Sequence, residues 1–289
     1  IGFVIGLAAI KMYRDAGATG GGFRKAFMRR RLARIVPLYL LTAAIFLFLV
    51  EPGLLQMKFK TLLSHIAAHL AFIHSWFYKT HGSINGPNWS VAVEMQFYLL
   101  TILVAPVLSK VKPWKILAWG IVISWLFRSA AFLWTIDRGD GYRTFIFTTQ
   151  VPGMADAFAA GIFLARLYLD GTLGALLERS RRNRWLLIGG TTIAVLVSLY
   201  FAMKIFWPNA KYWNNAYMVT FWRTSIAISF ALIVAIFSLL PDLTKRWAFK
   251  PFNYLGEISY GIYLWHLPVI LSLKRAFPAD DYLLILKWS

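Results

Sequence analysis

A carboxylate inside an apolar run is the first sign of chemistry in this chain. Glu94 lies in the stretch Trp89–Leu100, which reads WSVAVEMQFYLL. An ionised acid among lipid tails is costly, so such a residue usually faces a protein interior and marks a site. On a helix Ser90, Glu94 and Tyr98 share one face, because residues four apart lie about one turn apart. The alternative is a structural ion pair with an arginine of a neighbouring helix.

A second set of polar residues lies late in the chain, in the segment Leu255–Pro268. Ser259, Tyr263 and His266 are spaced i, i+4, i+7, which places them on one helix face. A hydroxyl, a phenol and an imidazole on one stripe could bind a polar ligand or relay protons. The alternative is hydrogen bonding between helices, worth about 0.6 kcal/mol per contact.

A dense basic cluster enters an apolar span at Arg29, Arg30, Arg31 and Arg34. Arg31 and Arg34 are three residues apart and share one helix face. The guanidinium fork matches phosphate oxygens, so the pair could bind a phosphorylated ligand. The alternative is an ordinary basic anchor on the cytoplasmic side of a membrane helix.

The histidines invite a metal hypothesis that the pattern does not support. His65 and His69 are spaced i, i+4, with His74 and His81 following. The stretch between the first two lacks the glutamate of a zinc-protease helix, and we expect no metal site. The chain has no cysteine, which excludes a disulfide and a thiolate nucleophile.

The composition is that of a membrane protein. Of 289 residues, 59% are hydrophobic and only 15% are charged, whereas soluble domains carry about 25% charge. Runs of about 20 apolar residues predict an all-α fold, a polytopic transmembrane helix bundle, since lipid admits only helices or closed barrels. The formal net charge is +19, but the charges lie between apolar spans, which indicates topology and membrane lipid rather than nucleic acid.

We expect one domain over residues 1–289, whose spans follow the apolar runs. They are 35–50, 89–109, 116–135, 151–170, 185–203, 219–240 and 252–272, with partial spans at 1–10 and 282–289. The shorter stretch 62–77 is ambiguous between a short span and an interfacial or re-entrant helix.

Basic residues favour one orientation. If 62–77 does not cross, 18 Lys and Arg lie on one side and 9 on the other. The positive-inside bias makes the first side, with segments 11–34, 110–115, 171–184 and 241–251, cytoplasmic. We therefore expect 62–77 to be interfacial or re-entrant on the outer face.

Two arginines lie deep within predicted spans and should have partners. They are Arg128 and Arg223, and the carboxylates available to them are Glu94 and Asp156. The sequence does not decide the pairing.

Together these segments resemble a known family, the integral-membrane acyltransferase family 3 of bacterial-type O-acyltransferases. The similar segments are Arg31–Tyr39, Trp89–Tyr98 and Leu255–His266, with a weaker likeness at Asp156–Gly161. Their order and spacing extend the resemblance over most of the chain. The resemblance implies a multi-pass protein of the bacterial inner membrane that moves an acyl group, most often acetyl, from acyl-CoA to a carbohydrate hydroxyl.

The resemblance also implies roles for individual residues. Glu94 and His266 become candidate catalytic residues, and acyl-CoA is a co-substrate, with no bound cofactor and no metal. Candidates for binding the phosphates of acyl-CoA are Arg30, Arg31 and Arg34. Candidates for contacting the acceptor or lining a tunnel are Trp89, Ser90, Tyr98, Ser259, Tyr260 and Tyr263.

One departure from the family concerns its general base. In the family, a histidine held to be catalytic lies on the first membrane helix, about ten residues after a basic residue. Ile1–Ile5 resembles the end of the second helix, so we expect the first helix and the C-terminal end to be absent from this chain. His266 matches a different family position.

Two other classes of function compete with the enzyme. In a transporter or flippase, Glu94, Arg128, Asp156 and Arg223 would line a substrate path without covalent chemistry. Paired interrupted helices in two related halves would favour it, and the sequence shows no such repeat. The third possibility is a non-catalytic membrane scaffold.

Overall fold

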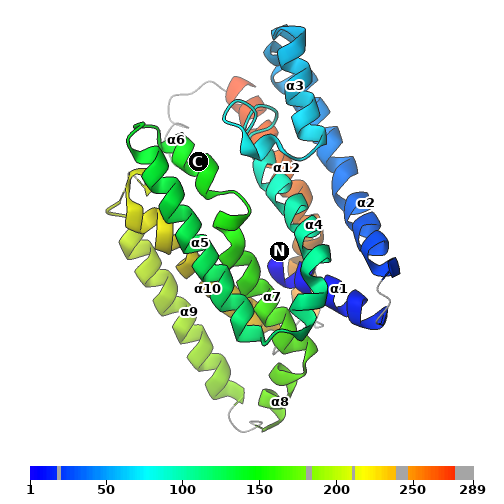
Figure 1. The fold of residues 1–289 in the computed structure, drawn as a ribbon, viewed down its shortest axis with the longest axis vertical. Helices are drawn as coiled ribbons and strands as arrows, with labels where there is room; N and C mark the ends of the chain where they lie inside the picture. The colour runs from blue at the N-terminus through cyan, green and yellow to red at the C-terminus, as the bar shows by residue number, and fades with distance from the viewer. Residues whose placement is uncertain (18–20, 180–183, 210–211, 239–246, 277–289) are drawn as a thin grey trace. The chain divides into compact units, whose positions relative to one another are not determined.

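The computed structural model describes residues 1–17, 21–179, 184–209, 212–238 and 247–276, and every regular element among them is a helix (Figure 1). Five of these helices are long and apolar enough to cross a membrane. They span Gly22–Val50, Asn88–Lys110, Pro113–Ile136, Ile188–Phe206 and Met218–Ser238. The predicted all-α fold, a multi-pass bundle of membrane helices, is confirmed.

The membrane helices expose apolar side chains where a soluble protein would expose polar ones. In α9 (Arg184–Phe206), only 11% of the most apolar 18-residue stretch is buried. Its side chains Ile193, Leu196 and Tyr200 are all exposed. A soluble monomer rarely exposes so large an apolar patch. Lipid tails are the natural surroundings of this face, because an α-helix satisfies its own backbone groups without water.

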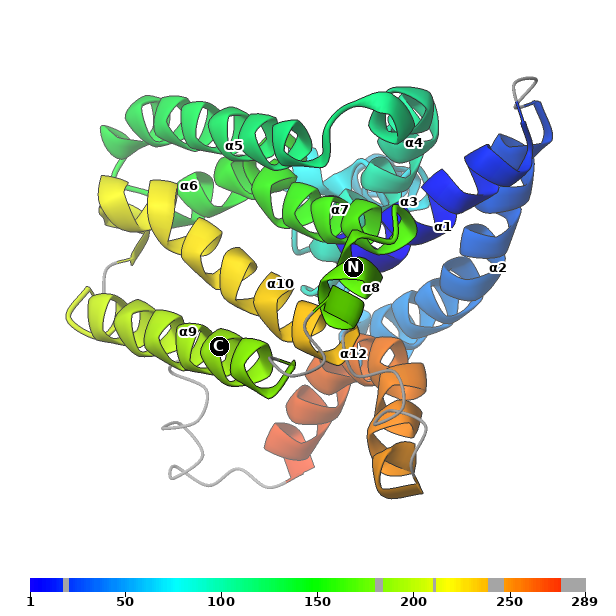
Figure 2. The same cartoon turned by 90° about the horizontal axis from the view of Figure 1, so that it is seen from below.

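The chain divides into two compact units. The first comprises Ile1–Arg29 and Met95–Lys250, and its centre is α7 (Ala155–Leu169). This helix packs against α1 (Gly2–Asp15), α5 (Pro113–Ile136) and α10 (Arg223–Ser238), and Figure 2 shows it between α5 and α10. A π-helical turn, η6 (Met218–Trp222), leads directly into α10.

Small residues let the helices of this unit approach closely. A Cβ atom built on Gly161 of α7 would lie 2.3 Å from the backbone nitrogen of Phe3, and one on Gly120 of α5 would lie 2.2 Å from the Ala159 Cβ. Such contacts are impossible for a larger side chain without a shift of the backbone. Close approach through small residues is a main source of helix association in membranes, where apolar burial gives little driving force.

The second unit comprises Arg30–Glu94 and Pro251–Ser289, of which residues up to 276 are described. It contains most of α2 (Gly21–Ile45), the π-helical turn η1 (Phe46–Val50) and the 3-10 turn η2 (Pro52–Gln56). The remaining elements are α3 (Phe59–Leu70), the 3-10 turn η3 (His74–Trp76), the start of α4 (Asn88–Lys110) and α12 (Lys250–Ala276). Its apolar core gathers around Phe46, Val50 and Ile84.

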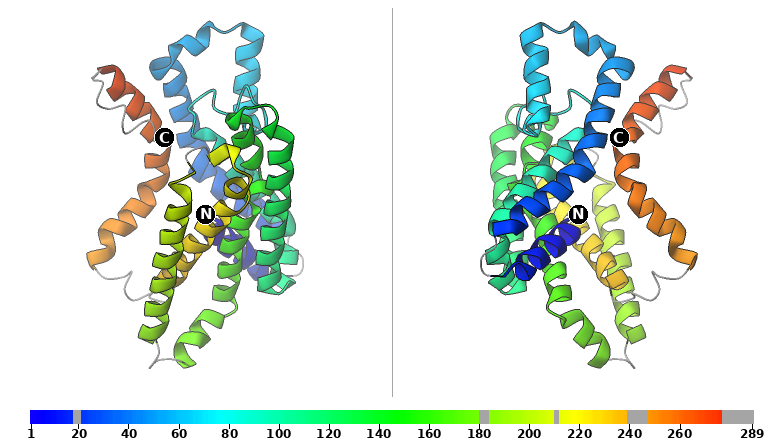
Figure 3. Two further views of the ribbon diagram at one scale, coloured as in Figure 1. Left: turned by 90° about the vertical axis from the view of Figure 1, so that its left-hand side faces the viewer. Right: turned by 90° about the vertical axis from the view of Figure 1, so that its right-hand side faces the viewer.

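Proline has a specific effect in α12. Pro268 has no N–H, so the Leu264 carbonyl four residues earlier loses its usual helical partner. The Asn85 side-chain amide donates to that carbonyl at 3.1 Å. Figure 3 shows α12 bent partway along its length, as a missing helical hydrogen bond predicts.

Among the described residues, helix ends differ from the expected spans at two places. A 3-10 turn, η4 (Pro152–Met154), precedes α7, so the span expected at 151–170 yields a helix of 15 residues. The stretch 62–77 yields α3, whose 12 residues extend about 18 Å, short of a hydrocarbon core of about 30 Å. The partial span expected at 282–289 lies outside the described residues.

The close contact at Gly161 leads to a stability prediction. We expect Gly161→Ala to lower stability by about 1–3 kcal/mol, because the added methyl group meets backbone atoms of α1. The matched control is Gly189→Ala on α9, where no atom lies within 4 Å of the new Cβ. Thermal unfolding in detergent tests this; equal melting of the two variants would contradict it.

Candidate active site

The start of α4 and the middle of α12 bring two hydroxyl groups together within the second unit. The Ser90 Oγ and the Tyr263 hydroxyl oxygen are 2.5 Å apart. Each of them also lies 3.0 Å from the Pro87 carbonyl oxygen. The short O–O distance indicates a strong hydrogen bond in which either oxygen can donate. The pair is therefore held on a main-chain acceptor at the N-terminal end of the helix that carries Glu94.

Glu94 lies one helical turn after Ser90 and is half-buried. Its carboxylate is close enough to interact electrostatically with the phenols of Tyr260 and Tyr263. The Tyr260 hydroxyl donates to the Ile35 carbonyl at 3.0 Å, which ties α12 to α2. Three of the residues singled out in the sequence, Ser90, Tyr260 and Tyr263, thus gather around the Glu94 carboxylate.

Other residues singled out in the sequence make contacts of their own, although the His266 ring lies 5.5 Å from the Tyr263 ring, centroid to centroid. The Ser259 hydroxyl donates to the Gly256 carbonyl of its own helix at 2.8 Å. His266 is exposed, and its Nδ1 contacts the Tyr263 carbonyl, also within α12. Tyr98 is buried in the first unit, where its ring packs edge-on against Phe27 at 6.0 Å.

The three candidate phosphate-binding arginines lie on one continuous helix. Arg30 and Arg34 are exposed and Arg31 is half-buried, all within α2. Because α2 is unbroken here, Arg31 and Arg34 share a face as the spacing predicted. Guanidinium groups that reach solvent from this part of the helix can bind an anionic ligand.

The histidines form a buried cluster whose shape the sequence did not reveal. The rings of His69 and His74 stack with their centroids 3.8 Å apart, and the His81 ring stacks on Trp89 at 5.5 Å. The Tyr39 hydroxyl donates to the His69 carbonyl at 3.3 Å. The i, i+4 spacing in α3 was the only sequence signal, since the remaining members come from a loop.

Burial keeps these imidazoles neutral. Desolvation lowers the pKa of His74 to about 3 and those of His69 and His81 to about 4. Within the described residues, no three His, Cys, Asp or Glu side chains are arranged to hold a metal ion. The cluster is a set of neutral hydrogen-bonding rings at neutral pH.

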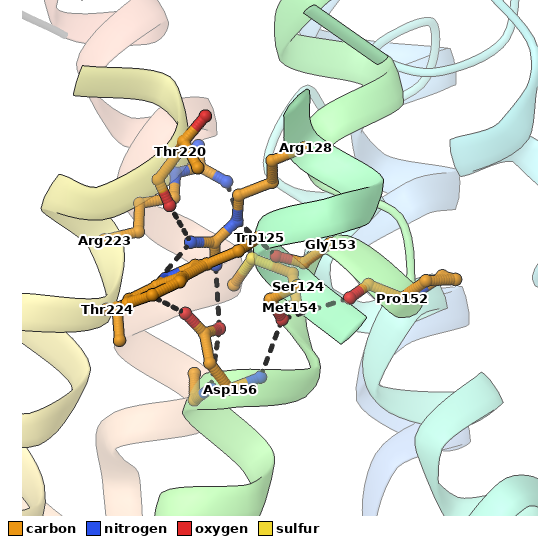
Figure 4. A network of polar contacts seen from close by, with 11 residues as sticks. Ser124, Trp125, Arg128, Pro152, Gly153, Met154, Asp156, Thr220, Arg223 and Thr224 are labelled. Atoms are coloured by element: carbon orange, nitrogen blue, oxygen red, sulfur yellow. Dashed lines mark hydrogen bonds and ion pairs between the residues drawn. The ribbon is translucent and has the colours of Figure 1, made fainter. Parts of the chain in front are cut away.

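A separate polar network lies in the first unit, around Arg128 (Figure 4). Its guanidinium is 2.7 Å from Asp156 Oδ1, and both side chains are only 1% exposed. Arg128 also donates to the Gly153 carbonyl at 2.6 Å and to the Thr220 carbonyl at 3.1 Å. Losing one partner of a buried pair costs about 3–5 kcal/mol, because the other charge is left in an apolar medium.

The Asp156 carboxylate is fully engaged as well. Oδ1 also accepts from the Ala157 N–H at 2.8 Å, and Oδ2 accepts from the Thr224 hydroxyl at 2.5 Å. The sequence left open whether Arg128 pairs with Glu94 or Asp156, and the structure identifies Asp156. Both carboxylate oxygens of Asp156 therefore have hydrogen-bond partners within the first unit.

Arg223 contacts an aromatic ring and a sulfur atom nearby. It lies over the Trp213 ring at 4.9 Å and contacts the Met154 sulfur at 3.5 Å. With Phe158 and Phe230 it lines a mainly apolar cavity of about 390 Å³.

Comparison with known proteins agrees with the sequence pattern. A family profile described as an acyltransferase domain matches residues 2–288. The O-acetyltransferase OatA of Staphylococcus aureus strain NCTC 8325 is 27% identical over 268 residues, covering 87% of this chain and 42% of the relative. The peptidoglycan O-acetyltransferase OatA of Listeria monocytogenes is 27% identical over 266 residues, covering 85% and 40%.

The chain spans about two fifths of the length of these curated relatives. No solved structure matches it.

The neutral histidines predict an acid-sensitive stability. Above about pH 6.5 the rings are neutral in both the folded and the unfolded chain. Below that pH the histidines of the unfolded chain bind protons, whereas the buried rings of the folded chain stay neutral. The free energy of unfolding therefore falls as the pH drops towards about 4. At pH 5 the loss is about 2 kcal/mol per buried imidazole, and thermal unfolding at pH 7 and pH 5 measures it.

His74→Gln should weaken this pH dependence, because it removes one of the buried titrating rings. His266→Gln, at an exposed histidine, is the matched control and should leave the dependence unchanged. Identical pH dependence in the wild type and in His74→Gln would argue against the prediction.

Proposed function

The chain belongs to the integral-membrane acyltransferase family 3, and we propose that it transfers an acyl group, acetyl in the first instance, from acyl-CoA to a hydroxyl of an envelope carbohydrate. The observation that carries the proposal is the Glu94 carboxylate beside the Ser90–Tyr263 hydroxyl pair, inside an otherwise apolar helix. The names of the Staphylococcus and Listeria relatives support acetyl as the group transferred, and the Listeria name supports a peptidoglycan acceptor.

The reaction requires groups of these kinds. The acceptor oxygen attacks the thioester carbonyl, a C–O bond forms, the C–S bond breaks, and the hydroxyl proton passes through a base to the departing thiolate. Glu94 can accept a hydrogen bond from the acceptor hydroxyl and so position it for attack. The Tyr263 hydroxyl can donate to the carbonyl oxygen as negative charge develops there.

Among the described residues His266 is the candidate general base, although it matches a different position from the histidine that is held to be catalytic in the family. Its Nδ1 is engaged with the main chain of α12, which directs Nε2 away from that contact. A neutral imidazole suits proton removal near pH 7, and a positioned base contributes about 10²–10⁴-fold to such a reaction.

The acyl-CoA donor would bind at the basic end of α2. Positive-inside bias places Arg30, Arg31 and Arg34 on the cytoplasmic side, which is where acyl-CoA is available. Phosphate oxygens of CoA match the guanidinium geometry. With this expected topology, the N-terminal end of α4 and the acceptor would lie on the outer face of the inner membrane.

Transport without chemistry is the weaker hypothesis. It required Arg128 and Asp156 to line a substrate path, whereas these two side chains are buried and bonded to each other. The cavity beside Arg223 is mainly apolar, which does not suit a polar or glycan-linked cargo.

We expect Glu94→Gln to reduce acyl transfer by at least about 100-fold with unchanged expression, because the amide keeps the shape of the carboxylate but loses its charge. The assay follows label from radiolabelled acetyl-CoA into the glycans of cells that express each variant. Glu51→Gln is the matched control, since Glu51 is a carboxylate of the same unit that pairs with Arg275 at 2.7 Å. Full activity of Glu94→Gln would remove Glu94 from the site.

Substitution of the basic pair tests the donor side. Arg31→Gln and Arg34→Gln should each raise the KM for acetyl-CoA about tenfold and leave kcat nearly unchanged, since a hydrogen bond to a charged group is worth about 1.5–3 kcal/mol. Arg24→Gln, at an exposed arginine two turns earlier on α2, should have no effect. An equal effect of all three variants would indicate a general basic anchor.

A further inference from the structure

The loop between α3 and α4, residues 71–87, carries unusual backbone at both of its ends. Phe72 has φ of 55° and Asn85 has φ of 51°, and neither is glycine. Left-handed backbone is strained for most side chains and persists where the surroundings impose it. Such positions are suited to act as hinges of the segment between them.

Within this loop and at the start of α4 lies a set of polar atoms that the described part of the chain leaves unsatisfied. Both ring nitrogens of His74 and the side-chain oxygens of Asn85 and Asn88 have no hydrogen-bond partner among the described residues. Backbone groups of Ala68 and Asn88 lie near the His74 ring, but neither forms a hydrogen bond of normal geometry with it. His74, Asn85 and Asn88 are all 0% exposed. A buried polar group without a partner costs free energy, so a set of them at one place points to a ligand or to water.

The chemistry of this set favours a neutral ligand with hydroxyl groups. A neutral imidazole offers one donor and one acceptor, and each amide oxygen is an acceptor, so together they match a hydroxyl group. Lys79 is the only Asp, Glu, Lys or Arg residue in the stretch 61–93. Lys79 is therefore the one charged side chain of the stretch that a phosphate could meet, and the described residues hold no group of His, Cys, Asp and Glu arranged for a metal ion.

The outward side of the same loop is aromatic. Trp76, Phe77 and Tyr78 are 44%, 54% and 44% exposed. Internal bonds fix the two-sided arrangement, since the Thr80 hydroxyl donates to the His74 carbonyl at 2.9 Å and the His81 N–H donates to the Phe77 carbonyl at 2.9 Å. Exposed aromatic planes and buried neutral polar groups occur on the same short loop, and both are needed to bind a sugar, which has apolar ring faces and peripheral hydroxyls.

We propose that residues 71–87 form the acceptor-binding cap, in which Trp76–Tyr78 hold a sugar ring and His74, Asn85 and Asn88 receive its hydroxyl group. The loop opens about Phe72 and Asn85 to admit the sugar. Asn88 begins α4 and Glu94 follows six residues later, about 9 Å along the helix axis, so a captured sugar chain reaches the carboxylate. This inference rests on the proposed acyl transfer and adds the place where the acceptor binds.

Binding of neutral oligosaccharides to the full chain in lipid nanodiscs tests the proposal. Chitotetraose and cellotetraose serve as probes, with no acyl donor present, and calorimetry gives the affinity. Trp76→Ala and His74→Phe should each weaken binding at least about tenfold. The matched control is Trp119→Ala, which removes a 64% exposed tryptophan from α5 and should bind as the wild type does.

Two results would overturn the proposal. One is a wild type that binds neither oligosaccharide. The other is a Trp76→Ala variant that binds as Trp119→Ala does, in which case the aromatic residues contact lipid headgroups as an interfacial belt. Trp76 is exposed, so its variant tests the proposal even if His74→Phe does not fold.

Measuring both oligosaccharide binding and acetyl transfer on the same protein distinguishes this proposal from the proposed function. Oligosaccharide binding that depends on Trp76, without acetyl transfer from acetyl-CoA, would refute the enzyme and leave the sugar site standing. Acetyl transfer, together with an oligosaccharide affinity that is the same in the wild type and in the Trp76 and His74 variants, would refute the sugar site and leave the enzyme standing.

Discussion

Lipid tails offer no hydrogen-bond partner, and this constraint governs the polar groups of both units. Helical backbone satisfies itself, but each buried side chain with a charge or a hydrogen-bonding atom must find its partner within the protein. Arg128 and Asp156 do so completely, with every carboxylate oxygen engaged. The buried charges of the first unit are therefore compensated within the protein, and its close glycine contacts bring the backbones of neighbouring helices together.

The polar groups of the second unit are less completely paired among the described residues. Glu94, the Ser90–Tyr263 pair and the buried histidines gather polar atoms, and some of the histidine nitrogens have no partner among the described residues. A structural network gains from complete satisfaction, whereas a binding site must keep donors and acceptors for its ligand. This contrast distinguishes the ion pair, which stabilises, from the region around α4, where chemistry is expected.

Sequence reasoning found the features that one helix or one composition determines. The membrane class, the long helices and the exceptional position of Glu94 all follow from apolar runs and from the cost of a charge in lipid. The shared faces of Arg31 with Arg34 and of Ser90 with Glu94 follow from helical spacing. Contacts between distant segments could not be derived in this way, which is why the partner of Arg128 stayed open and why Ser259 and Tyr98 were expected near the site.

The histidine cluster shows the same limit. Spacing aligned His65 with His69 on one face, but His74 reaches the stack only through the path of an irregular loop. The turn that shortens α7 is likewise local to Pro152 and is hidden within an apolar run. Features that depend on loop conformation need coordinates, whereas features that depend on periodicity do not.

The number of residues in the π-helical turn before α10 affects which side chains contact Arg128. A π turn holds one residue more than an α turn, and Thr220 within it and Thr224 just after it both contact Arg128. Deleting one residue between Tyr217 and Arg223 would leave the number of residues that an ordinary α turn needs, so the turn can become α-helical while α10 keeps its register. Thr224 would then still face Asp156, whereas Thr220, which lies within the turn itself, would change its position relative to Arg128.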